Sequence, residues 1–243
     1  MRFILIVLLF IPSICQAYTI DEWISFYLRD CKPEYTACRE NLEKGFGKMI
    51  AYSNITFKYL DKRGLPRWLA TIPFVESDYR EKAVSDAGAI GMWQIMPYHI
   101  ERYKTRTIKR LGREITIVPN DDQIKAYGFN PIISTEIATH LLADLYAKYS
   151  DKKDMEKLAI MAYNGGNRVD LWLSGKSELR QETIDYYNKI MAIQHILTHM
   201  KRYEIEPVTF RKIFIFDYIK ALVSMEKRIE REKTHELIAY ILG

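Results

Sequence analysis

The sequence is poor in the patterns that mark several protein classes. Its three cysteines among 243 residues are too few for a disulfide-dense secreted scaffold. It contains no stretch of roughly 20 apolar residues, so no typical transmembrane helix is predicted. It also has no long lysine or arginine run, and the formal net charge of +5 gives no argument for nucleic-acid binding. A modest positive charge is compatible with an anionic polymer as partner but does not identify one.

The first seventeen residues have the composition of a cleavable secretory signal. Arg2 provides a positive start, residues 3–11 are apolar, and Pro12 ends the apolar run. Small residues before position 18 predict cleavage near Ala17, and hence a protein that is periplasmic or secreted. Lipidation of Cys15 is not predicted, because the residues before it do not resemble a lipoprotein signal.

The two cysteines that remain after cleavage are expected to pair. Cys31 and Cys38 are close in sequence, and Pro33 between them disfavours an uninterrupted helix. In an oxidising compartment an even pair of this kind usually forms a local disulfide. Zinc binding is not predicted, because no histidine lies near either residue.

Apolar residues at helical spacing dominate the chain and predict a mainly α fold. One β-branched segment, Glu114 to Val118, reads as a strand and predicts a small hairpin. We expect the polar segment from Tyr103 to Gly128 to form a flap beside a cleft. No linker or internal repeat separates a second module. The predicted organisation is a signal peptide (1–17), an N-terminal helical segment (18–63), a catalytic domain (64–200) and a C-terminal helical extension packed on it (201–243).

Glu76 is the first candidate for chemistry. It follows Leu69 and Ile72 at helical spacing, which places it on the apolar face of the predicted helix. Burial raises the pKa of a carboxyl, as a general acid near neutral pH requires. For an isolated buried glutamate, a structural ion pair is the commoner explanation.

Two further segments combine small and polar residues. The stretch from Ser85 to Pro97 begins with small residues that include two glycines, and Gln94 and Met96 lie near its end. An amide can both donate hydrogen bonds to sugar groups and accept them. A second segment, Ala162 to Gly166, places Tyr163 and Asn164 at a glycine turn that ends a helix. Taken singly, each motif is weak.

Taken together and in order, these motifs resemble the catalytic domain of the lytic transglycosylases, in the soluble lytic transglycosylase and goose-type lysozyme-like superfamily. The similarity is greatest to the membrane-bound lytic transglycosylase D class. Ile72-Pro73 before Glu76-Ser77 matches that class, and so does Glu182-Thr183-Ile184-Asp185-Tyr186. The resemblance extends from Gly64 to Leu197 and implies a lysozyme-like helical domain. It departs from the family at Tyr127 to Pro131, where the usual charged residues are absent.

The resemblance implies cleavage of the β-1,4 bond between N-acetylmuramic acid and N-acetylglucosamine, with formation of a 1,6-anhydromuramic acid end. Glu76 would serve as acid and then as base, and no metal or cofactor would be needed. The other site residues implied are Ser77, Gln94, Met96, Tyr163, Asn164 and Tyr186. Met92 and Trp93 are expected to be shared between the hydrophobic core and a surface that packs against the sugar (a sugar platform).

Two alternatives stay open. One is a goose-type lysozyme-like hydrolase in which Asp86 positions a water molecule, and the other is a non-catalytic peptidoglycan-binding protein. The expected partner is the peptidoglycan glycan strand, together with a component of an envelope machinery. Neither nucleic-acid binding nor a stable membrane span is expected. The protein is expected to be a monomer.

Overall fold

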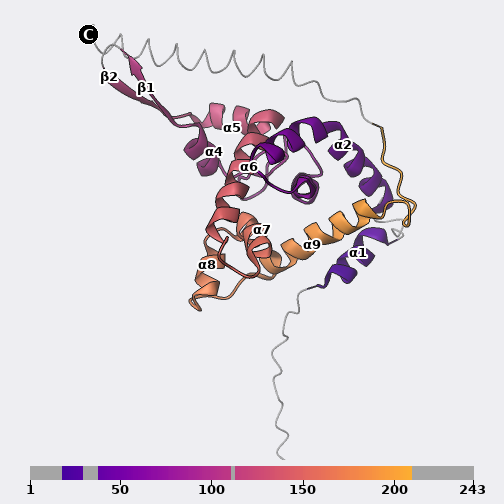
Figure 1. The fold of residues 1–243 in the computed structure, drawn as a ribbon. Coiled ribbons are helices and arrows are strands. Elements are labelled where there is room, and N and C mark those ends of the chain that lie inside the picture. Colours follow the sequence, from indigo (N-terminus) through magenta and orange to yellow (C-terminus); the bar gives the residue numbers. More distant parts are fainter. Residues whose placement is uncertain (1–17, 30–37, 111–112, 210–243) are drawn as a thin grey trace, which may run out of the picture.

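The computed structural model describes residues 18–29, 38–110 and 113–209, which are largely helical (Figure 1). The predicted mainly helical class with one small hairpin is confirmed. In chain order the elements are α1 (Ile20–Leu28), α2 (Cys38–Lys62), the 3₁₀ helix η1 (Arg67–Thr71), α3 (Ile72–Ser77), α4 (Pro97–Lys104), β1 (Arg106–Arg110), β2 (Arg113–Ile117), α5 (Asp121–Phe129), α6 (Pro131–Lys148), α7 (Met155–Gly165), α8 (Arg168–Leu173) and α9 (Gln181–Thr198).

Helix α6 is the central element, and it contacts α2, α4, α5 and α7. Asn130-Pro131 in the sequence predicts a cap and a first helical turn at this point, and the structure confirms both. Asn130 caps the helix by accepting hydrogen bonds from the backbone N–H groups of Ile132 and Ile133, at 3.0 and 3.2 Å. Pro131 occupies the first turn, where no N–H is needed. The cap fixes where α6 begins, and the helix then continues through the main hydrophobic core.

Helix α2 shares one core with the segments that follow it. Met49, Ile55 and Leu60 belong to the same buried cluster as Leu65 and Leu69. Helix α2 therefore packs into the same hydrophobic core as the first helices of the predicted catalytic domain.

Apolar residues from Leu65 to Val75 predict one helix that bends near Pro73. The structure instead forms two short helices here. The 3₁₀ helix η1 ends at Thr71, and α3 begins at Ile72. Pro73 lies in the first turn of α3, where its missing N–H leaves no hydrogen bond unmade. The proline thus marks a new helix start, and it shortens the segment that carries Glu76 to six residues.

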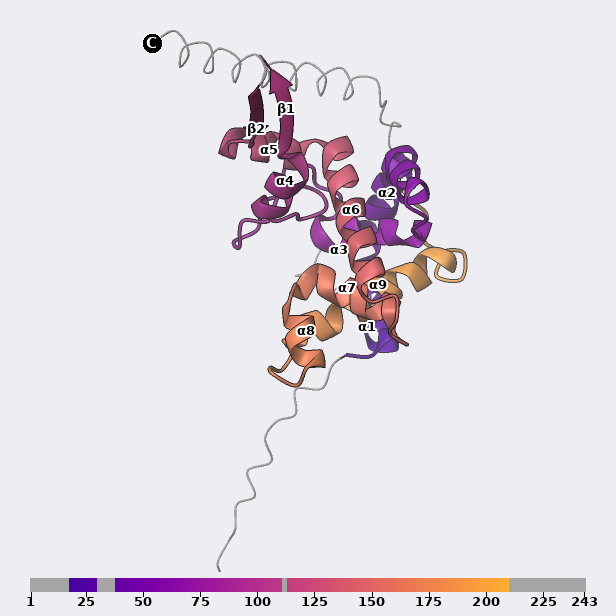
Figure 2. The ribbon, with the colours of Figure 1, turned by 60° about the vertical axis from the view of Figure 1, so that its left-hand side comes forward.

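The hairpin β1–β2 confirms the strand predicted around residues 114–118. Its register pairs Ile108 with Ile115 and Arg106 with Ile117. The hairpin projects away from the helices beyond α4 and α5, while α7, α8 and α9 lie at the other end of the fold (Figures 1 and 2).

Helices α1 and α9 pack side by side (Figure 1). Ile24 of α1 is buried against Ile193 and Ile196 of α9. The backbone just before α1 is also held, because the N–H of Tyr18 donates to Oδ1 of Asp185 at 2.9 Å. The segment that contains α1 therefore contacts α9 at Asp185 in its first half and at Ile193 and Ile196 in its second half.

Some sequence predictions fall outside the described residues. These are the signal peptide (1–17), Cys31 with its pairing to Cys38, and the helix expected from about 214 to 242. Within the residues that the structure describes, no helix is both long and apolar enough to cross a membrane.

Candidate active site

Several separated segments surround a cavity of about 460 Å³. Its walls come from α3, the loop from Ser85 to Met96, the end of α7, the start of α8 and the first half of α9. Of the predicted site residues, Glu76, Gln94, Met96, Tyr163, Asn164 and Tyr186 all line this cavity. Ser77 does not line it.

Glu76 lies in the last turn of α3 and presents its carboxyl to the cavity. The Tyr186 hydroxyl donates a hydrogen bond of 2.5 Å to its Oε1. Burial raises the pKa of Glu76 to about 7, and the negative charge of Glu182 acts in the same direction. The Tyr186 hydrogen bond and the positive charge of Lys189 lower the pKa but do not offset burial. The carboxyl is therefore near half protonation at neutral pH, which suits a group that must both give and accept a proton.

The two tyrosines beside Glu76 are neutral hydrogen-bond donors. Burial raises the pKa of Tyr163 and of Tyr186, and the nearby Glu76 charge adds to this. The Tyr163 hydroxyl donates to the backbone carbonyl of Trp93 at 2.8 Å. Tyr163 thereby joins the end of α7 to the loop that carries Gln94.

The loop from 84 to 96 has a tightly constrained backbone. Two isolated bridges join Val84 to Ile90 and Ile90 to Ile95. Gly91 has a φ of 77°, and a Cβ there would lie 2.0 Å from the carbonyl oxygen of Gly128, so no other residue fits. Gln94 also has a positive φ, 47°, and its Nε2 donates to the Gly91 carbonyl at 2.7 Å. A non-glycine residue held in this conformation is typical of functional sites.

The residues around Gln94 divide clearly between core and cavity. Met92 and Trp93 are fully buried in the core, and the Trp93 indole N–H donates to Thr135 at 2.9 Å. Neither serves as a sugar platform. Met96 faces the cavity, as predicted.

Asn164 has a structural partner as well as a place at the cavity. Its Oδ1 accepts a hydrogen bond from the Thr183 hydroxyl at 3.0 Å. Gly165 lies against the same threonine, since a Cβ there would be 2.7 Å from its Cγ2. The glycine turn at the end of α7 thus permits close contact with the start of α9.

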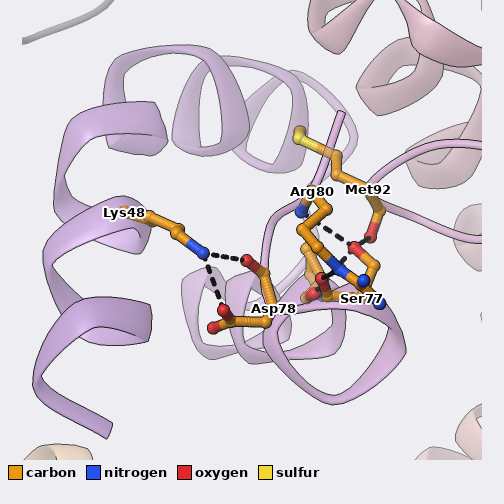
Figure 3. A network of polar contacts seen from close by, with 6 residues as sticks. Lys48, Ser77, Asp78, Arg80 and Met92 are labelled. Carbon is orange, nitrogen blue, oxygen red and sulfur yellow. Dashed lines mark hydrogen bonds and ion pairs between the residues drawn. The ribbon is translucent and has the colours of Figure 1, made fainter. Parts of the chain in front are cut away.

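Ser77 points into the protein behind α3. Its hydroxyl donates to the Met92 carbonyl at 2.9 Å and accepts from the backbone N–H of Arg80 (Figure 3). It therefore fixes α3 to the loop that carries Gln94, and its effect on Glu76 is through the backbone.

The turn after Ser77 is held from α2. Asp78 and Tyr79 both adopt left-handed backbone conformations, with φ of 53° and 57°. The Lys48 ammonium donates to the Asp78 carbonyl oxygen at 2.8 Å and to its Oδ2 at 2.6 Å (Figure 3). Two consecutive non-glycine residues in this region are costly, by roughly 1–3 kcal/mol each. The Lys48 contacts help to stabilise this reversal of the chain.

Four charged residues at the cavity were not assigned to the site from the sequence, and only Glu182 among them had been noted, as part of a family motif. They are Glu182, Arg168, Arg180 and Lys189. The spacing did hold a signal: Glu182 and Tyr186 are four residues apart and Lys189 a further three, so all three share one face of α9. No comparable pattern marks Arg168 or Arg180.

The carboxylate proposed for a hydrolase does not lie at the cavity. Asp86 is exposed and does not line it, whereas Ser85 and Ala87 on either side do. In the described part of the chain, no group of three or more histidine, cysteine or acidic side chains is arranged to hold a metal ion. The predicted flap also differs in position, because no residue of the hairpin lines the cavity.

Part of this chain is similar in sequence to curated proteins. The curated relatives include the membrane-bound lytic murein transglycosylase D of Escherichia coli K12 and its counterpart in E. coli O6:H1. Each is 27% identical over a matched length of 157 residues, and the match covers 58% of this chain and 30% of the relative. This chain therefore spans less than a third of the curated relatives that it matches.

Among solved structures, an inactive mutant of the lytic transglycosylase Slt from Pseudomonas aeruginosa is similar at 20% identity and a TM-score of 0.40. The likeness covers 68% of this chain and 27% of that one. The Transglycosylase SLT domain family matches residues 53–184, which include Glu76, Gln94 and Tyr163. Because this match extends over more than half of the sequence, the chain belongs to the Transglycosylase SLT domain family.

Proposed function

We propose that this protein is an envelope murein lytic transglycosylase, with Glu76 as its single acid and base. The bond cleaved would be the β-1,4 bond between N-acetylmuramic acid and N-acetylglucosamine, leaving a 1,6-anhydromuramic acid end. The observation that carries the proposal is the Glu76 carboxyl at the cavity, with its pKa raised to about 7 and the Tyr186 hydroxyl bound to it.

The first step uses the protonated form of Glu76. The carboxyl donates its proton to the glycosidic oxygen as the bond to the anomeric carbon breaks. The muramic acetamido carbonyl stabilises the positive charge that develops at that carbon. The resulting Glu76 carboxylate is stabilised by the Tyr186 hydroxyl, whose hydrogen bond favours the ionised form.

In the second step the same carboxylate removes the proton from the C6 hydroxyl of the muramic acid. The C6 oxygen bonds to the anomeric carbon, and Glu76 returns to its protonated form. No water is consumed. Gln94 and Met96 would contact the sugar, while Tyr163, Asn164 and Ser77 hold the surrounding walls in place through Trp93, Thr183 and Met92.

Glu182 supports a second candidate function. It lines the same cavity and raises the pKa of Glu76, so it lies within electrostatic reach. Most glycosidases use two carboxylates, and one of them can activate water. A lysozyme-like hydrolysis would therefore use Glu182, since Asp86 does not line the cavity.

Mass spectrometry of the fragments released from purified sacculi separates the two reactions. The transglycosylase gives muramic ends lighter by one water and no new reducing ends, and Glu182→Gln keeps this product pattern. Reducing ends as the main product, together with loss of activity in Glu182→Gln, would establish hydrolysis. A murein zymogram without any clearing would instead support a non-catalytic binding protein.

The location is proposed on separate grounds. The signal-like residues 1–17 and the murein substrate both favour the periplasm or the exterior of a bacterium. Mature protein beginning at Tyr18 in a periplasmic extract, measured by N-terminal sequencing, is the expected result.

A further inference from the structure

Three basic side chains line the cavity in addition to the groups assigned above. Arg168 is the first residue of α8, Arg180 precedes α9, and Lys189 lies in the middle of α9. Among the residues that the structure describes, none of the three forms a salt bridge with a carboxylate. These cations are therefore available to a ligand in the cavity.

Lys189 is held in place by an aromatic residue of α1. Its ammonium lies 4.7 Å from the centre of the Trp23 ring, a cation–π contact between α9 and α1. This contact fixes a side chain that otherwise has many rotamers. One of the three cations is thus oriented before any ligand binds.

The start of α9 adds positive potential on the same side. Arg180 is the N-cap residue of this 18-residue helix, and no side chain caps the first turn. The N-terminal end of a helix carries a partial positive charge. Arg180 and this helix end therefore act together on an anion at the cavity.

Opposing negative charge is limited. Below pH 7 Glu76 is mostly protonated and therefore mostly uncharged. Among the residues that line the cavity, the negative charge of Glu182 then faces the positive charges of three cations. The glycan backbone of murein is uncharged and does not account for this excess. Murein carries its negative charge on the 3-substituent of muramic acid. In intact strands the carboxylates are those of the stem peptide, and in strands without peptide the lactyl group provides one.

We propose that Arg168, Arg180 and Lys189 form a subsite for a carboxylate on the muramic acid 3-substituent. This inference rests on the proposed function and specifies its substrate class as charged muramyl strands. Arginine suits this task, because its planar fork can donate two parallel hydrogen bonds to one carboxylate. The subsite would favour murein over neutral chitin-like chains.

Binding measurements in a Glu76→Gln background test the subsite without turnover. Calorimetry would compare soluble peptide-bearing strands, amidase-stripped strands and chitooligosaccharides. Arg168→Gln combined with Arg180→Gln should weaken binding of a charged strand by about tenfold or more, since two charge-assisted contacts are lost. Lys189 stays unchanged, because its charge also lowers the pKa of Glu76. The matched control is Lys176→Gln, an exposed cation between α8 and α9 that does not line the cavity.

The three ligands distinguish the possible sources of the carboxylate. Loss on peptide-bearing strands alone assigns the subsite to a stem-peptide carboxylate, and loss on stripped strands assigns it to the lactyl carboxylate. An equal loss on chitooligosaccharides, or an equal loss in Lys176→Gln, overturns the subsite. These outcomes leave the proposed reaction intact, because that reaction is judged by the anhydro product of the wild-type enzyme.

Discussion

Glu76 and Ser77 are neighbours in sequence, yet they serve two different sides of α3. On the cavity side, the Glu76 carboxyl has a raised pKa and a hydrogen bond to Tyr186. On the opposite side, the Ser77 hydroxyl donates to the Met92 carbonyl, and the Lys48 ammonium donates to the carbonyl and the carboxylate of Asp78 (Figure 3). These contacts hold the helix and the turn after it. Adjacent residues on one short helix therefore have different roles: one faces the cavity and carries the acid, and the next holds the helix in position. If so, substitutions on the two sides should differ in size and kind.

The largest expected effect comes from the cavity side. Glu76→Gln should keep the fold and glycan binding while lowering turnover by at least about 10⁴-fold, because the amide can neither donate the proton nor take it back. Turnover would be measured as release of muropeptides from sacculi. Asp86→Asn serves as the control and should keep most activity, since this residue does not line the cavity. Near-normal turnover in Glu76→Gln would refute the assignment of the acid.

The same substitution should stabilise the protein at high pH. The unfolded chain releases the Glu76 proton near pH 4.5, whereas the folded protein keeps it until about pH 7. Because the unfolded state binds fewer protons in this window, burial of Glu76 lowers stability as the pH rises through it. Glu76→Gln should therefore gain up to about 3 kcal/mol relative to the wild type at pH 8, and little at pH 4. Urea unfolding at both pH values measures this, and an equal difference at the two would contradict the raised pKa.

Tyr186→Phe tests the hydrogen bond that favours the ionised carboxyl. Turnover should fall by about tenfold, the usual effect of losing a hydrogen bond to a charged group. The pKa of Glu76 should rise, because the Tyr186 hydroxyl lowers it in the wild type. Activity that needs protonated Glu76 would then persist to higher pH, and the alkaline limb of the rate profile would move upward. Tyr187→Phe, on the same helix but outside the cavity, is the matched control and should leave the profile unchanged.

The smallest effect is expected on the opposite side. Lys48→Met removes the two hydrogen bonds to Asp78, but both side chains are partly exposed, with relative areas of 27% and 41%. The loss of stability should therefore be about 0.5–1 kcal/mol, and turnover should fall only a few-fold. Lys44→Met, which breaks an exposed pair with Glu40 on the same helix, is the control. Loss of stability without any loss of turnover would show that this side does not position Glu76.

Local patterns predicted much of the fold. The Asn130 cap, the glycine end of α7 and the β-branched strand each depend on residues close in sequence, so the sequence alone revealed them. The break between η1 and α3 was missed, because Pro73 fits both a bent helix and a helix start. Hydrophobic periodicity does not distinguish these two conformations.

The candidate site divides in the same way. The family resemblance implied six of the residues that line the cavity, among them Glu76 and the Tyr186 that binds it. The direction of Ser77 was not predictable, because its partner Met92 reaches it only through tertiary packing. Arg168 and Arg180 were missed for a similar reason, since an exposed arginine is common and only the folded cavity shows where it lies.

The left-handed turn at Asp78 has a further consequence for the acid. It ends α3 directly after Ser77, so Glu76 lies in the last turn of a helix. The aligned peptide dipoles give this end a partial negative charge, which disfavours a carboxylate there and works in the same sense as burial. The Lys48 ammonium, bound to the Asp78 carbonyl, partly neutralises that end. Extending α3 by one turn would move Glu76 away from this helix end, so the point at which the helix stops helps to set the strength of the acid.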